Sequence, residues 1–310
     1  MWNYEVYGLR LQSDTRIEGL TLSTDPGTPQ LLLDTSPFSP ALNLLFGTSA
    51  PADDDNVAIA PAAGGHAVGY RDGTRFFIEA GGSLIRASWP SSSTPEDMAT
   101  YLLGPLLAFV LRIRGSLCLH ASAVVIEEHA VVLAAPHGGG KSTTAARFSD
   151  RGVPVMSDDV VPIRWKEDLP VADAGYPRLR LWDETAQTLY GNADALPRLT
   201  PTWSKRYLDL QSDQRQFAGG EQPIGVIFIL GERRPGVPSV GRLRGHDAAM
   251  RLIANTSMGL HLDAAARVGE LEGIARLTDR VPVFLAQATD DLERIDEFCD
   301  LIMTAACSAL

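Results

Sequence analysis

A strand pattern that runs directly into three glycines, a lysine and a serine constrains this chain more than any other feature. Residues 130–135 form an apolar run that predicts a buried strand, and residues 138–142 read GGGKS, which predicts a turn into a helix over residues 141–150. Glycines tolerate positive φ and a close backbone approach, so the amides of residues 137–141 can point inward around phosphate oxygens. A strand, a glycine-rich turn and a helix in this order indicate a phosphate-binding loop in an α/β fold.

The residues of this loop predict how it would hold a nucleotide. Lys141 is placed to reach the β- and γ-phosphates, Ser142 to offer its hydroxyl to Mg²⁺, and the helix start to direct its positive end at the anion. Ala135 replaces the first glycine of the usual P-loop pattern, and a glycine-rich turn without a ligand is the alternative. We predict that ATP and Mg²⁺ are bound by the loop residues His137, Gly138, Gly139, Gly140, Lys141, Ser142 and Thr143.

Two adjacent carboxylates, Asp158 and Asp159, follow the apolar segment 153–156. We expect this segment to be a strand beside the P-loop strand, so that its carboxyl end meets the phosphates. One aspartate would then hold Mg²⁺ or its bound water, and the other would accept a proton from an incoming hydroxyl. The predicted metal ligands are therefore Ser142, Asp158 and Asp159, and a solvated Asp-Asp turn is the alternative.

Basic side chains complete the predicted site. His120 precedes a predicted strand over residues 121–126 and is expected near the phosphates, with a buried core histidine as an equal alternative. The predicted catalytic residues are His120, Lys141, Asp158 and Asp159. Lys205 and Arg206 either clamp the nucleotide, attract an acidic peptide or form an exposed basic pair.

The chain divides into two predicted domains, residues 1–92 and residues 93–310. The first is a small β-rich domain with a hairpin turn at Asp72-Gly73. The second is the α/β domain, with further strands over residues 153–156 and 223–230 and an amphipathic helix over residues 290–306.

A helix is expected at the start of the second domain. Thr94 is its predicted N-cap, Pro95 its first residue and Asp97 a complement to its exposed amides. Its apolar spacing extends to Gly115, and Pro105 predicts a kink.

Composition excludes several classes of protein. Of 310 residues 45% are hydrophobic and 21% charged, which is typical of a folded globular protein. The 27 basic and 38 acidic residues give a net charge of −11, which disfavours nucleic acid and anionic membranes as partners.

The apolar stretch 102–113 is too short to span a bilayer, and no secretory signal is recognised, so we expect a cytoplasmic protein. The three cysteines fit neither a disulfide framework nor a zinc site, and residues 53–55 predict a solvated acidic loop.

Three segments together resemble the HPr kinase/phosphorylase superfamily: residues 119–124 (LHASAV), 138–143 (GGGKST) and 156–160 (MSDDV). The resemblance covers about residues 115–230 and implies an α/β P-loop kinase core shared with phosphoenolpyruvate carboxykinase. Segments 4–14 (YEVYGLRLQSD), 176–182 (YPRLRLW) and 205–210 (KRYLDL) look more like the HPr-kinase-like enzymes of lasso peptide biosynthesis.

The resemblance carries functional implications. It implies that Lys141 and Ser142 bind ATP and Mg²⁺, and that His120, Asp158 and Asp159 surround the transferred phosphoryl group. It further implies that the acceptor is a serine of a ribosomally made precursor peptide and that a homo-oligomer is plausible.

The chain departs from the regulatory enzymes of that superfamily in two places. A glycine-rich segment that supplies a metal-binding glutamate is replaced by residues 178–184 (RLRLWDE). Asp183 or Glu184 could substitute as ligand, and Arg180 could neutralise phosphate charge or lie with Arg178 on a solvated strand face. The segment associated with phosphorylase activity is not found, so we predict a kinase without an efficient phosphate-dependent reverse reaction.

Other functions share parts of this pattern. A kinase of an HPr-like carrier protein would use the same core residues, and a small-molecule kinase would need a closed pocket. A nucleotide-gated module that binds a precursor peptide without phosphorylating it is the non-enzymatic alternative. Asp158 and Asp159 argue against this last alternative, because phosphate binding alone requires no proton acceptor.

Overall fold

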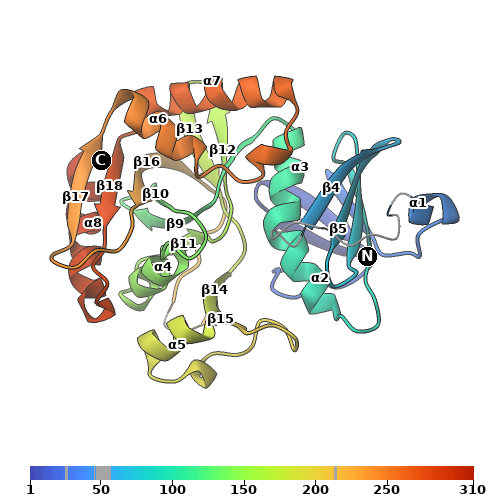
Figure 1. Ribbon diagram of the computed structural model, residues 1–310, viewed down its shortest axis with the longest axis horizontal. Coiled ribbons are helices and arrows are strands. Elements are labelled where there is room, and N and C mark those ends of the chain that lie inside the picture. Colours follow the sequence, from blue (N-terminus) through green and yellow to red (C-terminus); the bar gives the residue numbers. More distant parts are fainter. Residues whose placement is uncertain (25–26, 45, 47–56, 213–214) are drawn as a thin grey trace.

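The computed structural model describes residues 1–24, 27–44, 46, 57–212 and 215–310. A β-sheet unit and an α/β unit lie side by side, with the helices labelled α2 and α3 between them (Figure 1). The predicted α/β class with a β-rich N-terminal part is thus confirmed. The predicted acidic loop at residues 53–55 lies outside the described residues.

The N-terminal sheet pairs its described strands in the order β1-β2-β3-β7-β6-β5-β4. The strands are β1 (Trp2–Val6), β2 (Leu9–Ser13), β3 (Leu31–Asp34), β4 (Val57–Ala62), β5 (Gly65–Tyr70), β6 (Arg75–Glu79) and β7 (Leu84–Ser88), and a short helix α1 (Pro40–Leu44) follows β3. The alternating segment near the N-terminus forms a hairpin, because Tyr7 and Gly8 adopt positive φ and reverse the chain between β1 and β2. The predicted turn at Asp72-Gly73 joins β5 to β6, and Gly73 has φ +91°.

The helix after this sheet begins as predicted. In α2 (Pro95–Tyr101) the Thr94 hydroxyl accepts from the Asp97 amide, and the Asp97 carboxylate accepts from the Thr94 amide, which makes a capping box. A π-helical turn, η1 (Leu102–Leu106), accommodates Pro105, and α3 (Leu107–Ile113) follows. At Pro105, where a kink was predicted, the structure has a change from α-helical to π-helical turns within one continuous helical segment.

This helical segment shares its core with the N-terminal sheet. Leu102, Leu106 and Phe109 pack in one cluster with Phe76 and Ile78 of that sheet. The apolar side of the segment is thereby withdrawn from water. The boundary between residues 92 and 93 stays a prediction.

The second unit is built on a large mixed sheet. Its strands are β8 (Leu117–Leu119), β9 (Ala121–Ile126), β10 (His129–Ala134), β11 (Val155–Ser157), β12 (Val161–Lys166), β13 (Leu169–Asp173), β16 (Glu221–Leu230), β17 (Ser239–Leu243) and β18 (Val283–Gln287). They pair in the order β11-β9-β10-β16-β13-β12-β8, with β18 also beside β16 and β17 beside β18. The β10–β16 and β16–β18 pairs are parallel, which accounts for the continuous apolar runs in these strands.

Helices cover both faces of this sheet. On one face α4 (Lys141–Asp150) and α8 (Ile295–Ala309) pack through residues such as Phe148 and Phe298. On the other face α6 (Gly245–Ile253) and α7 (Ala264–Arg280) pack through Leu252 and Leu277. The C-terminal helix predicted to begin at residue 290 begins at Ile295, because a 3₁₀ turn η4 (Leu292–Arg294), capped by Asp291, occupies the preceding residues.

One predicted neighbour relationship is wrong. The strand that ends just before Asp158, β11, does not lie beside the P-loop strand, because β9 pairs antiparallel with both β10 and β11 and separates them. Two strands antiparallel to the same neighbour run parallel to each other, so β10 and β11 still end at the same edge of the sheet. That edge carries the candidate site.

A smaller hairpin extends beyond this edge. It consists of β14 (Arg178–Trp182) and β15 (Lys205–Asp209), connected through α5 (Asp183–Tyr190) and a 3₁₀ turn η2 (Ala193–Ala195) (Figure 1). Another 3₁₀ turn, η3 (Gly259–His261), precedes α7.

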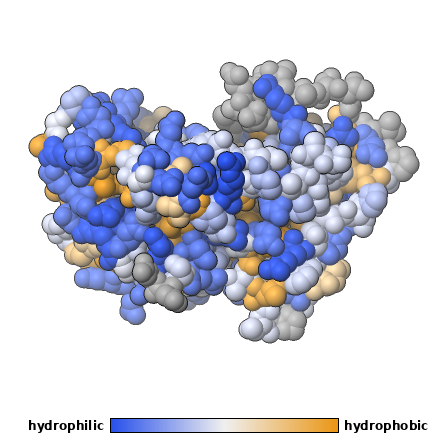
Figure 2. Space-filling view, turned by 90° about the horizontal axis from the view of Figure 1, so that it is seen from below, coloured by the Kyte–Doolittle hydropathy of each residue, from blue (hydrophilic) through white to orange (hydrophobic). Residues whose placement is uncertain are grey.

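The surface seen from below is mostly hydrophilic, with hydrophobic residues in scattered places (Figure 2). Among the described residues, no helix combines the length and apolar character that a membrane crossing needs.

Candidate active site

The loop between β10 and α4 has the backbone geometry of a phosphate cradle. Gly138 and Gly140 adopt φ of +75° and +90°, which glycine permits without a steric cost. Gly140 is the N-cap of α4, so the free amides of the first turn point toward the loop. A Cβ added to Gly139 would lie 2.6 Å from the Ala135 Cβ, so the glycine at 139 accommodates the alanine that replaces the usual first glycine.

Lys141 is turned back toward this loop. Its Nζ donates to the carbonyl oxygens of Ala135 at 2.9 Å and Pro136 at 3.0 Å, and the residue is buried. Burial lowers the pKa of the ammonium, although the carboxylates of Asp159 and Asp158 oppose this effect. The lysine thus lies at the loop that would hold phosphates.

Asp158 is held by three donors and is buried. Its Oδ1 accepts from Ser122 Oγ at 2.6 Å and from Ser142 Oγ at 2.8 Å, while its Oδ2 accepts from the Arg180 amide at 3.0 Å. The P-loop serine and the strand-end carboxylate are therefore in direct contact, as a shared Mg²⁺ site requires.

Asp159 faces a different set of partners. Its backbone has φ +71°, an unusual value for a residue with a side chain. Its carboxylate lies 3.4 Å from His120 Nε2 and 3.7 Å from an Arg180 guanidinium nitrogen, and its side chain is 33% exposed. Burial would raise the pKa of this carboxyl, but the hydrogen bond from His120 and the charges of Arg180 and Lys205 together hold it well below its usual value. The carboxylate is ionised and open to a reactant.

The predicted site residues line one cavity of about 110 Å³. Its lining is His120, His137, Gly138, Gly140, Lys141, Ser142, Thr143, Asp158, Asp159, Arg180, Leu181, Trp182, Thr185, Lys205 and Arg233. Of the residues predicted to be catalytic, to bind the metal or to form the nucleotide loop, only Gly139 is missing from this lining, and it lines an adjoining pocket. Carboxylate side chains and several basic side chains therefore surround the loop.

The basic pair Lys205-Arg206 is divided by the strand on which it lies. Lys205 lines the cavity with its ammonium 4.3 Å from the Trp182 ring, and burial lowers its pKa. Arg206 points to the other face of β15, where it pairs with Asp183 at 2.7 Å and Asp194 at 2.8 Å. The expectation of one shared role for the pair is thus wrong for Arg206.

The proposed substitute metal ligands are not in the cavity. Neither Asp183 nor Glu184 belongs to its lining, and Asp183 is engaged by Arg206. Arg180 does line the cavity and its side chain is only 8% exposed, so it does not lie on a solvated face. Among the described residues no cluster of three or more His, Cys, Asp or Glu side chains forms a metal site, so Ser142 and Asp158 would need phosphate and water oxygens to complete a coordination shell.

Sequence reasoning missed four of the lining residues. Leu181 and Trp182 lie at the end of β14, Thr185 lies in α5, and Arg233 follows β16 in the chain. The Trp182 ring also contacts the His137 ring edge-on at 5.9 Å between centroids. Burial and the nearby Lys205, His120 and Lys141 lower the pKa of His137. Arg233 comes three residues after the end of the apolar strand run 223–230, which is the one signal that places it at the same sheet edge.

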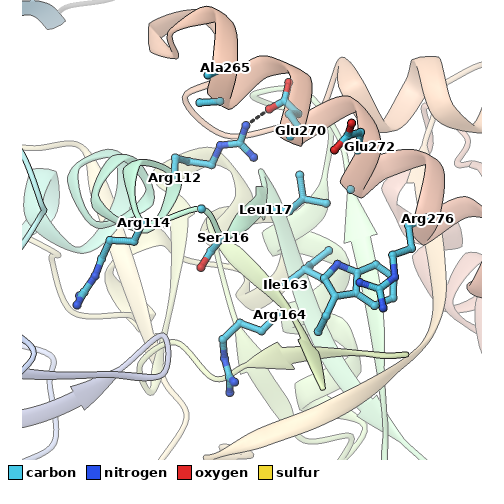
Figure 3. A pocket seen from close by; sticks show the side chains of 15 residues that line it. Arg112, Arg114, Ser116, Leu117, Ile163, Arg164, Ala265, Glu270, Glu272 and Arg276 are labelled. Atoms are coloured by element: carbon cyan, nitrogen blue, oxygen red, sulfur yellow. Dashed lines mark hydrogen bonds and ion pairs between the residues drawn. The ribbon is translucent and has the colours of Figure 1, made fainter. Parts of the chain in front are cut away.

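A larger cavity lies elsewhere in the molecule. It has a volume of about 630 Å³ and is bounded by α3, β8, β12 and α7, with Arg276 lying over the Trp165 ring (Figure 3). Arg112 crosses toward Glu270 on α7 and forms a buried ion pair with it (Figure 3). None of the predicted site residues belongs to this cavity.

Comparison with known proteins gives a likeness among solved structures only. No protein-family model and no curated protein matches the chain. Among solved structures the chain is similar to the HPr(Ser) kinase/phosphatase from Coxiella burnetii, with 12% sequence identity and a TM-score of 0.32, over 62% of this chain and 97% of that chain. At these values the activity of this chain has to be argued from its own residues.

Proposed function

We propose that this chain is an ATP- and Mg²⁺-dependent kinase that transfers the γ-phosphoryl group to a hydroxyl. One observation carries the proposal: Lys141 and Ser142 of the phosphate loop share a cavity with the carboxylates of Asp158 and Asp159. A phosphate-binding loop alone fits any nucleotide-binding protein. An additional open, ionised carboxylate fits phosphoryl transfer to a hydroxyl.

The cavity suits the triphosphate of a nucleotide. Gly138 leaves open space where a side chain would stand, and α4 begins at the loop with free amides. Lys141, Arg180, Lys205 and Arg233 supply positive charge around it, although the whole chain is acidic. Because phosphoryl transfer depends mainly on positioning and charge neutralisation, this arrangement matches the demands of the reaction.

Ser142 and Asp158 are the residues that would hold Mg²⁺. Their oxygens are 2.8 Å apart, and oxygen donors are what this cation prefers. When bound, the cation would neutralise charge on the phosphate oxygens. Ser122 and the Arg180 amide keep the Asp158 carboxylate oriented toward Ser142.

Asp159 is assigned the role of proton acceptor. In the proposed step the acceptor oxygen forms a bond to the γ-phosphorus, the bond from that phosphorus to the β,γ-bridging oxygen breaks, and ADP leaves. The hydroxyl proton passes to the Asp159 carboxylate. His120 and Arg180 hold this carboxylate in its ionised form before transfer.

The proposed acceptor is a serine of a ribosomally made precursor peptide. The motif resemblance to the kinases of lasso peptide biosynthesis supports this choice. The exposed Trp182 ring at the cavity, with 44% of its surface accessible, supports an acceptor larger than a small alcohol. We further propose that the enzyme has no efficient phosphate-dependent reverse reaction.

The test is an acceptor screen followed by intact mass. The protein is incubated with ATP and Mg²⁺ and, separately, a library of serine-containing peptides, an HPr-type carrier protein and a pool of small alcohols. We expect the peptides to gain a phosphate mass, with no gain for the Lys141→Met variant and full gain for Lys166→Met, whose lysine is exposed and bound to Glu221. Phosphorylation of the carrier or of a small alcohol alone would replace the peptide assignment. Nucleotide binding without transfer in any pool would favour the nucleotide-gated binding module.

A further inference from the structure

We propose that the helical segment between the two units completes the active site, and that Gly104 in its π-helical turn is a positioning residue for Asp159. This inference rests on the proposed function, because it concerns the carboxylate assigned as proton acceptor.

Gly104 packs closely against the Asp159 carboxylate. A Cβ added to Gly104 would lie 2.6 Å from Asp159 Oδ2 and 3.4 Å from Arg180 Nη1. The first distance is shorter than real Cβ contacts, so no side chain fits at position 104 while Asp159 keeps its place. The helix backbone thus touches the carboxylate directly.

The last turn of α2, directly before the π-helical turn, contacts Arg180. The Thr100 carbonyl accepts from Arg180 Nη1 at 3.1 Å. Arg180 in turn lies 3.7 Å from Asp159, so one turn of helix contacts both members of this pair.

The turn itself is tied to both units. The Tyr7 hydroxyl, from the first hairpin of the N-terminal sheet, donates to the Leu103 carbonyl at 2.9 Å. The Tyr7 amide donates to the Ala174 carbonyl at 2.7 Å, just after β13 of the large sheet. Tyr7 therefore fixes the π-helical turn relative to the sheet whose edge carries the site.

Asp159 needs these contacts because its own backbone conformation is unfavourable. With φ +71° it occupies a sparsely populated region, which persists only where surrounding structure holds it. Three neighbours position its carboxylate: the side chains of His120 and Arg180, and the backbone at Gly104. A displaced carboxylate would lose the alignment that proton acceptance requires.

Gly104→Ala is the test variant. Alanine is a better helix former than glycine, and the atom it displaces is the end of a side chain, so the fold is retained. We expect kcat for phosphoryl transfer to fall roughly 100-fold, as misplacement of a reacting group commonly does. The KM for ATP and the affinity for Mn²⁺ with a non-hydrolysable ATP analogue should stay within about twofold of wild type, because Ser142 and Asp158 are untouched. The control is Gly269→Ala in α7, where an added methyl meets open space.

A double-mutant cycle separates positioning from general damage. If Gly104 acts through Asp159, Gly104→Ala combined with Asp159→Asn should be no slower than Asp159→Asn alone. A Gly104→Ala enzyme with wild-type kcat, or losses that multiply in the double variant, would overturn the inference.

A crystal structure of Gly104→Ala tests the positioning role independently of the proposed kinase activity. An Asp159 carboxylate moved away from His120 and Arg180 supports the positioning role even if wild type transfers no phosphate. An unmoved carboxylate refutes it.

Discussion

The Ser142 hydroxyl donates to Asp158 Oδ1 at 2.8 Å, and so joins the phosphate loop to the end of a strand two positions away in the sheet. The buried Ser122 donates to the same oxygen at 2.6 Å from the strand between them. The carboxylate is therefore oriented before any ligand arrives. This pair is the core of the proposed metal site.

Ser142→Ala should weaken metal binding. Loss of the hydroxyl removes one proposed ligand and leaves Asp158 with Ser122 and the Arg180 amide, so we expect the Kd for Mn²⁺ with a non-hydrolysable ATP analogue to rise about 10-fold or more. Electron paramagnetic resonance of free Mn²⁺ measures this Kd. Ser308→Ala, an exposed serine of α8, should bind as wild type does, and an unchanged Kd in Ser142→Ala would remove the serine from the site.

Lys141→Met should abolish transfer without unfolding the protein. The methylene stem is kept while the charge that would neutralise phosphate is lost, so we expect kcat to fall by at least about 100-fold. Steady-state ADP formation with an acceptor peptide measures the rate, and circular dichroism checks the fold. An active, folded Lys141→Met protein would refute the assignment of the loop.

Substitution of the two aspartates should impair different functions of the site. Asp158→Asn should lose Mn²⁺ affinity, whereas Asp159→Asn should bind metal and nucleotide normally and lose roughly 10²–10⁴ in kcat, the range for a general base. Paired measurements of Mn²⁺ affinity and single-turnover rate separate the two. If Asp159→Asn lost metal and kept its rate, the roles assigned to the pair would be reversed.

Much of this site follows from local sequence, and some of it does not. The pattern GGGKS after an apolar strand predicts both the loop and a helix over residues 141–150, because turn chemistry and helix capping are local properties. The separation of Lys205 from Arg206 is also local in origin, since neighbours on a strand face opposite ways. What sequence alone left open was which of Asp158 and Asp159 takes which task, and their different contacts support the division that we propose.

The contribution of the helical segment 95–113 to the site could not be predicted from the sequence. Pro105 predicted a kink, but nothing in the local pattern shows that the resulting π-helical turn would bring Gly104 against Asp159. Such contacts depend on tertiary packing between segments far apart in the chain. The wrong neighbour predicted for β11 has the same cause, because strand order is not encoded in the apolar period of a single strand.

Arg112 and Glu270 form a buried ion pair between α3 and α7, with side chains 3% and 8% exposed. Removing one partner leaves an uncompensated charge, so Arg112→Met should lower the free energy of unfolding by about 3–5 kcal/mol. The combined Arg112→Met and Glu270→Met variant should recover most of this loss. Urea denaturation measures both, and equal stability of Arg112→Met and wild type would contradict a structural role for the pair.

The Arg147–Asp296 pair joins α4 to α8 and should make stability depend on pH. Two hydrogen bonds from Arg147, at 2.7 and 2.6 Å, lower the pKa of the Asp296 carboxyl below its usual 3.8. The stabilisation is therefore present above about pH 4 and lost as pH falls through the lower folded-state pKa. With the Asp296 side chain 50% exposed, solvent screening limits its size to about 0.5–1 kcal/mol.

Thermal denaturation of Arg147→Met and wild type over a pH series checks this dependence. The difference in Tm should be present at pH 7 and shrink below pH 4. Arg71→Met, which alters an exposed arginine, serves as the control. A Tm difference that grows on acidification would be the wrong sign for this pair.

The most direct measurement is a calorimetric titration of the protein with a non-hydrolysable ATP analogue, with and without Mg²⁺. One saturable site should appear, with an affinity that increases when Mg²⁺ is present and decreases in Lys141→Met and Ser142→Ala. That result would establish Lys141 and Ser142 as parts of a single metal–nucleotide site. Absence of binding, or equal binding by wild type and Lys141→Met, would contradict it.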